Sequence, residues 1–443
     1  RRQTLIDHAE QIRLSRSLVL LDENTPIDFT IDDLEVRNPD ADTLLGFLSE
    51  MEFRTLSKRV AEVLGREAPA IPEAPAPAVA DAPQVAEVAF DHGKYEQVGD
   101  AEALRVWLNR IYERGYVAVD TETTGLNEMT AELVGVSLAV EPGQACYIPL
   151  THKASRDDDL FGGEGLAPGQ MPVEEALQLL TPMLEDPAIL KIGQNMKYDS
   201  KIFAQLGIAV APIDDTMLMS YAMHAGLHGH GMDTLSERYL GHTPMPIKPL
   251  LGSGKSAVTF DKVPLADAVP YAAEDADVTL RLWQLFKPQL HRAEVTKVYE
   301  TLERPLVPVL AQMERSGIEV DRDTLSRMSN AFAQKMAGLE ADIHEFSGES
   351  FNVGSPAQLG EILFGKMGLP GGKKGKTGKY STGADVLEDL ATEHDLARRV
   401  LDWRQLSKLK STYTDALQDH VNADTGRVHT CYSIAGAATG RLA

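Results

Sequence analysis

The spacing of apolar residues divides the chain into four stretches. Residues 1–66 show helical periodicity, whereas residues 67–88 alternate Ala and Pro and carry few large apolar side chains. Such a composition cannot build a core and favours extended conformations, so we expect a linker there. Residues 89–291 alternate strand-like and helix-like segments, and helical periodicity dominates residues 292–443. The pattern predicts a helical stub, a linker, an α/β domain and an all-α region.

The α/β stretch has the pattern of a largely buried sheet with helices around it. Residues 116–120, 132–140, 144–150 and 188–195 are rich in apolar residues of strand type, and residues 172–186 and 197–207 have helical periodicity. The helix predicted over 100–115 starts after Asp100, a favourable N-cap, and stops at Gly115. Beyond residue 291, only "GRVHTCYSIAG" (426–436) is compatible with a strand.

Composition and charge narrow the class of protein. The formal net charge of −23, from 43 basic and 66 acidic residues, argues against a uniformly basic protein that coats nucleic acid. Cys146 and Cys431 lie far apart, so they suggest neither a disulfide framework nor a zinc site. No stretch approaches about 18 consecutive apolar residues, and no charged-then-apolar leader opens the chain. We therefore expect a cytoplasmic protein that does not contact a membrane.

Acidic residues recur where the predicted strands and helices end. Asp120 and Glu122 in "VAVDTETTGL" are spaced i, i+2, so on a strand both side chains leave the same face. A lone pair of this kind is usually solvated. Asp199, however, starts a helix after a buried-looking strand, and Tyr271 and Asp275 lie one helical turn apart. Four carboxylates and one phenol are thus candidates to converge.

Four close carboxylates require cations. Oxygen ligands in this number suit Mg²⁺ or Mn²⁺ better than zinc, and without cations the acids would repel one another. Two divalent ions about 4 Å apart would clamp the attacking and leaving oxygens of a phosphodiester displacement. In that arrangement a metal-bound water attacks, Tyr271 orients the water, and the second ion stabilises the departing 3′ oxygen. The alternative reading treats Tyr271 as a packed aromatic and Asp199 as a helix cap.

Three motifs in order resemble a known nuclease family. "DTETTGL", "GQNMKYD" and "YAAEDADVT" are similar to the exonuclease motifs of the DEDD superfamily in its tyrosine-bearing branch, which has a ribonuclease H-like fold. The resemblance implies that Asp120, Glu122, Asp199 and Asp275 bind two Mg²⁺ or Mn²⁺ ions and that Tyr271 is catalytic. It places Thr121 and Leu126 near the bound 3′ end, and Asn195 at a position that supports the site or binds the terminal nucleotide of the DNA. Asp214 and Asp215 also fit the family, and we interpret them as supporting residues.

The flanking sequence resembles family A DNA polymerases. "LERPLVPVLAQMERSGIEVD", "FNVGSPAQLGEILF", "RQLSKLKSTYTDAL" and "GRVHTCYSIAGAATGRL" are similar to the thumb and the segment that follows it. The resemblance implies the end of a 5′ nuclease domain (1–66), a linker (67–88), a 3′–5′ exonuclease domain (89–291) and the start of the polymerase domain (292–443). Because the chain begins without Met and ends at "AATGRLA", we expect a fragment.

Basic residues in the last region suggest contacts with duplex DNA. The Gly-rich loop at 366–379 carries cations and no acid, and such a loop would contact phosphates without sequence preference. A solubilising surface loop is the alternative. The expected DNA-contacting residues of this region are Lys373, Lys374, Lys376, Lys379, Arg404, Lys408 and Lys410, and the resemblance adds Arg441 at the minor groove near the primer terminus.

The resemblance as a whole implies a bacterial, nucleoid-associated and monomeric DNA-directed DNA polymerase used in repair and replication. Its DNA partners would be single-stranded or frayed 3′ ends at the exonuclease and primer–template duplex at the thumb. The chain stops before the acidic palm motifs, so we expect exonuclease activity and no primer extension from this segment. Two alternatives stay open, namely a free-standing DEDD-type exoribonuclease and a DNA-holding module whose carboxylates no longer bind metal.

Overall fold

The computed structural model describes residues 2–21, 26, 39–51, 53–66, 88–154, 165–254, 257–375 and 378–443. They belong to two compact units, one within residues 1–78 and the other within 79–443. Apart from Val88, the predicted linker lies outside the described residues, as does Lys376. Among the described residues, no helix could span a membrane.

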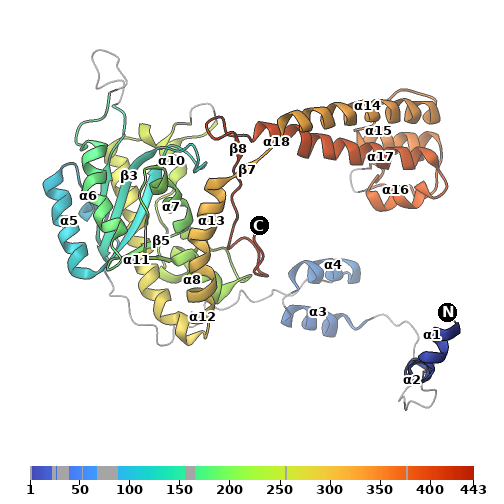
Figure 1. The fold of residues 1–443 in the computed structure, drawn as a ribbon, viewed down its shortest axis with the longest axis horizontal. Helices are drawn as coiled ribbons and strands as arrows, with labels where there is room; N and C mark the ends of the chain where they lie inside the picture. Colours follow the sequence, from blue (N-terminus) through green and yellow to red (C-terminus); the bar gives the residue numbers. More distant parts are fainter. Residues whose placement is uncertain are drawn as a thin grey trace. The chain divides into compact units, whose positions relative to one another are not determined.

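The first unit is helical, as its periodicity predicts. Its described helices are α1 (Arg2–Asp7), α2 (Ala9–Val19), α3 (Ala41–Glu50) and α4 (Arg54–Leu64) (Figure 1). Asp40 caps α3 by accepting a hydrogen bond from the backbone N–H of Thr43 at 2.8 Å. Helices α3 and α4 pack on each other, and Leu45 and Leu48 on α3 are buried.

A six-stranded mixed sheet forms the first part of the second unit. Its strands follow the order β1-β4-β3-β2-β5-β6, with β2–β3 and β3–β4 antiparallel and the other pairs parallel. The strands are β1 (Glu96–Gln97), β2 (Tyr116–Thr123), β3 (Leu133–Glu141), β4 (Gln144–Pro149), β5 (Leu190–Gly193) and β6 (Ile213–Asp215).

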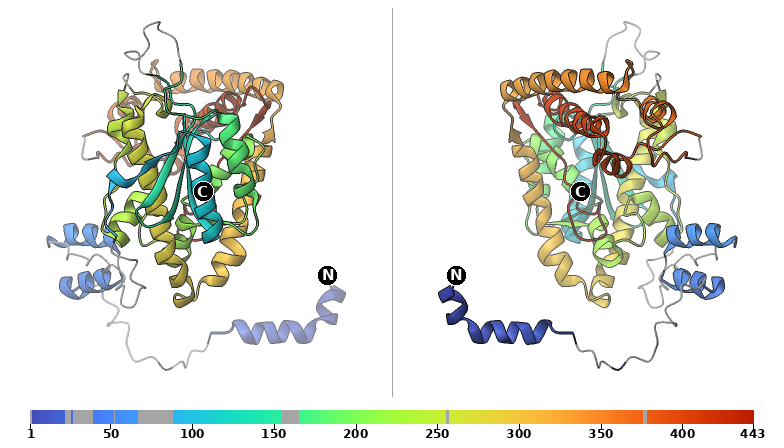
Figure 2. Two further views of the ribbon diagram at one scale, coloured as in Figure 1. Left: turned by 90° about the vertical axis from the view of Figure 1, so that its left-hand side faces the viewer. Right: turned by 90° about the vertical axis from the view of Figure 1, so that its right-hand side faces the viewer.

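Helices cover both faces of this sheet, which explains why its strands are apolar on both sides. Val117 and Val119 of β2 belong to the core formed with α5 (Ala101–Arg114), α6 (Val173–Glu185) and α7 (Met196–Gln205). Ala118, on the opposite face of β2, packs with Ala273 and Ala276 of the long helix α11 (Leu265–Arg292). Figure 2 shows the strands between these helical layers. The face of β2 that carries Ala118 is therefore the face toward α11.

Local signals in the sequence set the ends of these helices. Asp100 caps α5 by accepting from Ala103 N at 2.9 Å, and Gly115 ends the helix in a left-handed conformation with φ 75°, both as predicted. Shorter helices follow the sheet, namely α8 (Thr216–His224), α9 (Met232–Leu235) and α10 (Ile247–Leu251).

The rest of the second unit is helical. Its helices are α12 (Thr296–Val298), α13 (Arg304–Ser316), α14 (Arg322–Ser347), α15 (Pro356–Gly360), α16 (Ala384–Ala391), α17 (Asp395–Leu409) and α18 (Ala416–Asp419). Helices α14 and α17 lie side by side in Figure 1, and Ile343, Leu363 and Val400 share a core with α16.

A small sheet interrupts this helical region. Strand β8 (Arg427–Val428) forms in the segment that the sequence marks as compatible with a strand. Its antiparallel partner is β7 (Ile318–Glu319), which the helical periodicity of that region does not predict. Because a two-residue strand has no period of its own, only the pairing defines it.

Candidate active site

The acid pair lies on β2, which continues through both residues to Thr123. Asp120 pairs with Ser137 of β3, and Glu122 pairs with Gly135. Because side chains alternate between the two faces of a strand, both acids lie on the same face of the sheet as Ala118, which is the face toward α11. The predicted i, i+2 arrangement on one face of a strand is therefore present in the structure.

Helix α11 supplies the facing groups. Tyr271 and Asp275 lie one turn apart on this helix, and the Tyr271 hydroxyl hydrogen-bonds the Asp275 carboxylate. Carboxylate oxygens of Asp120, Glu122 and Asp275 all lie within 4.8 Å of one another. Among the described residues, the buried Oε1 of Glu122 has no hydrogen-bond partner. An unpartnered carboxylate oxygen among other acids is what a cation site requires.

Asp199 reaches the cluster from the end of β5. It lies in the first turn of α7 and is 2% exposed. Its Oδ1 accepts hydrogen bonds from the Thr121 backbone N–H at 3.1 Å and from the Thr121 hydroxyl at 2.5 Å. Thr121, predicted near the bound 3′ end, is itself buried and holds Asp199 beside the acids of β2.

Burial is the main reason why the pKa of each of the four carboxylates lies above its ordinary value. The pKa of Asp199 is raised to about 7, although its hydrogen bonds from Thr121 act in the opposite direction, and that of Asp275 to about 8. For Asp120 and Glu122 the neighbouring acids raise the pKa further. Burial and Asp275 also raise the pKa of Tyr271, so its hydroxyl keeps its proton at neutral pH. These residues fit divalent cations, which would offset the repulsion.

The metal-free protein is expected to lose stability as pH rises from about 4 to about 8. Carboxyls with pKa values of about 7 and 8 in the folded state and about 4 in the unfolded chain favour folding while protonated. That contribution is complete below pH 4 and is lost as pH passes through the folded-state values. Urea midpoints measured with EDTA at pH 5 and pH 8 test this, and Mg²⁺ should restore the midpoint at pH 8. A midpoint that is higher at pH 8 than at pH 5 in EDTA would contradict the account.

Two residues predicted at the 3′ end follow the site strands. Leu126, beyond β2, is 91% exposed, and Asn195, between β5 and α7, is exposed with φ 65°. Because β2 and β5 are parallel neighbours, both residues come after strand ends at the same edge of the sheet. Asp215, interpreted as a supporting residue, accepts hydrogen bonds from the backbone N–H groups of Asn195 and Met196 and also caps α8.

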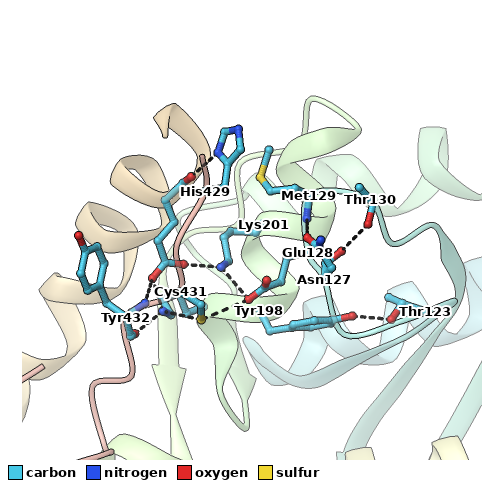
Figure 3. A network of polar contacts seen from close by, with 12 residues as sticks. Thr123, Asn127, Glu128, Met129, Thr130, Tyr198, Lys201, His429, Cys431 and Tyr432 are labelled. Carbon is cyan, nitrogen blue, oxygen red and sulfur yellow. Dashed lines mark hydrogen bonds and ion pairs between the residues drawn. The ribbon is translucent and has the colours of Figure 1, made fainter. Parts of the chain in front are cut away.

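A polar network that the sequence did not predict lies beside the site, and Figure 3 shows it. The Lys201 ammonium donates to Glu128 at 2.7 Å and also pairs with Glu314 of α13. Lys197, one turn earlier on α7, pairs with the other oxygen of Glu314 and donates to the Tyr432 carbonyl. Glu314 also accepts from Tyr432 N at 2.7 Å. The two lysines four residues apart were the only sequence signal, and they do not identify their distant partners.

The basic residues of the helical region differ in whether they are exposed or already bonded to other residues of the protein. Lys373 and Lys379 are exposed, and the Lys374 ammonium lies 4.6 Å from the centre of the Tyr380 ring. Arg404, in contrast, donates to the Thr382 carbonyl and hydroxyl, and Lys410 pairs with Asp415 at 2.6 Å. Lys408 and Arg441 are exposed. The predicted DNA contact of Lys376 falls outside the described residues.

Comparisons with known proteins agree with this architecture. The family model described as 3'-5' exonuclease matches residues 95–291, and the model described as DNA polymerase family A matches residues 322–443. DNA polymerase I of Rhizobium leguminosarum is 46% identical across all of this chain and half of its own length, and DNA polymerase I of Pseudomonas aeruginosa is 40% identical across 99% of the chain and 46% of its own length. The chain spans about half the length of these relatives.

A solved structure is also similar. The POL domain of Pol1 from M. smegmatis, in complex with DNA primer-template and dNTP, aligns with a TM-score of 0.62 and 26% identity over 78% of this chain and 54% of that one.

The fold and these matches define a 3′–5′ exonuclease domain followed by the start of a family A polymerase domain. The chain belongs to the bacterial DNA polymerase I family. The predicted fold class, a mixed α/β exonuclease sheet followed by a helical polymerase region, is confirmed. Membership of the exonuclease family implies divalent metals.

Proposed function

We propose that the α/β domain is a proofreading exonuclease that removes nucleotides from the 3′ end of DNA by two-metal-ion hydrolysis. The observation that carries this is the convergence of Asp120, Glu122 and Asp275 within 4.8 Å, with the buried Asp199 held beside them. The match to a polymerase family over residues 322–443 argues against a free-standing exoribonuclease. The pure DNA-holding alternative does not explain why four acids gather in one place, two of them, Glu122 and Asp199, buried.

Each residue has a specific task in this proposal. Asp120, Glu122, Asp199 and Asp275 would hold two Mg²⁺ or Mn²⁺ ions, which supply an activated water and stabilise the leaving oxygen. Tyr271, anchored by Asp275 and protonated at neutral pH, orients the attacking water through its hydroxyl. Thr121 fixes the Asp199 carboxylate through two hydrogen bonds to one oxygen, leaving the other oxygen for a cation.

The substrate end is proposed to bind beyond the strand ends. The exposed Leu126 side chain offers an apolar surface on which the terminal base can pack, and Asn195 offers an amide for its sugar or phosphate.

The domain division proposed is 1–66 for the end of a 5′ nuclease domain, 67–88 for the linker, 89–291 for the exonuclease and 292–443 for the thumb and the start of the palm. In a full-length protein these domains would proofread for a DNA-directed DNA polymerase in repair and replication.

A primer with a 3′-terminal mismatch tests the proposed function. The chain is expected to release 5′-mononucleotides from the 3′ end when Mg²⁺ is present, and Asp120→Ala/Glu122→Ala is expected to release none. An RNA primer of the same sequence tests the exoribonuclease alternative. Equal activity of the chain and the double variant would mean that the chemistry takes place elsewhere, and no activity in either would favour a holding module.

Duplex binding by the helical region should depend on the loop lysines Lys373, Lys374 and Lys379, which form no ion pair within the described part of the chain. Replacing Lys373, Lys374 and Lys379 by Ala is expected to reduce the slope of log K against log salt by about 2 to 3, because each phosphate contact contributes about 0.9. Lys366→Ala is the matched control, since Lys366 is paired with Glu349 at 2.5 Å. Fluorescence anisotropy of a labelled primer–template at several salt concentrations measures this. An unchanged slope in the triple variant would contradict the phosphate contacts.

A further inference from the structure

A second cluster of metal-ligating side chains lies outside the candidate active site. The Nε2 atoms of His92 and His242 each lie 2.7 Å from the same oxygen, Oε1 of Glu274. All three ligand atoms lie within 4.8 Å of one another. The three residues come from the segment after the linker, from the loop before α10 and from α11, so only the fold brings them together.

The carboxylate at the centre of this cluster is buried without a strong cation. The Glu274 side chain is 1% exposed, and among the described residues neither Lys nor Arg forms an ion pair with it. Its hydrogen-bond partners among the described residues are the two imidazoles and the backbone N–H of Met245, which donates to Oε2 at 2.6 Å. The two imidazoles and the Met245 N–H place polar groups around both oxygens of this buried carboxylate, and a divalent ion among the three ligand atoms would add a compensating positive charge.

Packing against Phe90 restrains one of the three ligands, His242. The His242 ring stacks on Phe90, with ring centroids 3.6 Å apart and an interplanar angle of 11°. The guanidinium of Arg281 lies over the Phe90 ring, 3.9 Å from its centre. His92 leaves an access route, because its side chain is 42% exposed. The site is thus fixed by two ligands and open at the third.

We propose that His92, His242 and Glu274 form a site for a divalent transition metal of the zinc type. Two imidazoles and one carboxylate prefer Zn²⁺, Co²⁺ or Ni²⁺, whereas the all-oxygen set of the candidate active site prefers Mg²⁺ or Mn²⁺. A solvent molecule would complete the coordination. The bound ion would connect His92, in the segment after the linker, to Glu274 on α11. This inference does not depend on the proposed nuclease function.

Cobalt is the probe for this site. In excess Mg²⁺, the 443-residue chain is expected to bind one equivalent of Co²⁺ with visible absorption bands typical of low coordination number, which an octahedral oxygen site does not give. His92→Gln is expected to weaken this binding about 10- to 100-fold or more. His291→Gln, an exposed histidine at the end of α11, is the control and should leave the bands unchanged.

Unfolding provides the second measurement. One equivalent of Zn²⁺ should raise the thermal midpoint of the chain and of His291→Gln, and should not raise that of His92→Gln. Because His92 is partly exposed, its variant is expected to fold, and His242→Gln gives a second test of the same ligand set. Absence of the cobalt bands in the unmodified chain, or their persistence in both His92→Gln and His242→Gln, would overturn the proposal.

Discussion

Asp199→Asn is expected to lower the rate of 3′-end hydrolysis by at least about 10³-fold while making the metal-free protein more stable. The amide keeps an oxygen that can accept both hydrogen bonds from Thr121, so the position of the side chain is preserved. Its negative charge is lost, and with it the affinity for a divalent ion. The same loss removes a buried charge that repels Asp120 and Glu122 in the metal-free state.

Opposite signs for activity and stability distinguish this effect from damage to the fold. Single-turnover hydrolysis of a mismatched primer and urea unfolding in EDTA at pH 8 measure the two quantities. Asp267→Asn, an exposed acid on α11, is the matched control and should change neither. Reduced activity together with reduced stability in EDTA would mean that Asp199 is a structural residue.

Glu314→Gln is expected to destabilise the second unit by about 3–5 kcal/mol, the usual cost of removing one partner from a buried ion pair. Glu314 is 2% exposed and pairs with Lys197 and Lys201, whose side chains are also buried. The substitution leaves Lys197 without a carboxylate partner among the described residues, whereas Lys201 retains Glu128.

Chemical denaturation of the chain measures this effect. Glu319→Gln, an exposed position just beyond α13, is the control and is expected to change the free energy of unfolding by less than about 0.5 kcal/mol. A change below about 1 kcal/mol for Glu314→Gln would show that water or a shifted side chain compensates the two lysines. Because the network joins α7 to the segment at Tyr432, its loss should also loosen the contact between the sheet domain and the polymerase region.

Local features of the active site were predictable from the sequence because they rest on short-range geometry. The i, i+2 spacing of Asp120 and Glu122 places them on one face of β2, and the i, i+4 spacing of Tyr271 and Asp275 places them on one face of α11. The caps at Asp100 and Gly115 follow from the conformations that those residues favour.

Long-range features were not predictable, because single-sequence patterns carry no information about distant partners. The buried role of Thr121 beside Asp199, the pairing of β7 with β8, and the ion pairs of Glu314 each depend on contacts between segments far apart in the chain. The hydrogen bond from Arg404 to Thr382 was also not predictable, because the charge of Arg404 alone suggested a contact with phosphate. Burial decides these roles, and burial appears only with the fold.

The most direct test of the central claim is to locate the metal ions. A crystal of the chain soaked in Mn²⁺ with a short single-stranded DNA should give two anomalous difference peaks about 4 Å apart among Asp120, Glu122, Asp199 and Asp275. The terminal phosphodiester should lie beside them. A DNA strand bound at this edge of the sheet with no peak among the four carboxylates would contradict the proposed two-metal exonuclease.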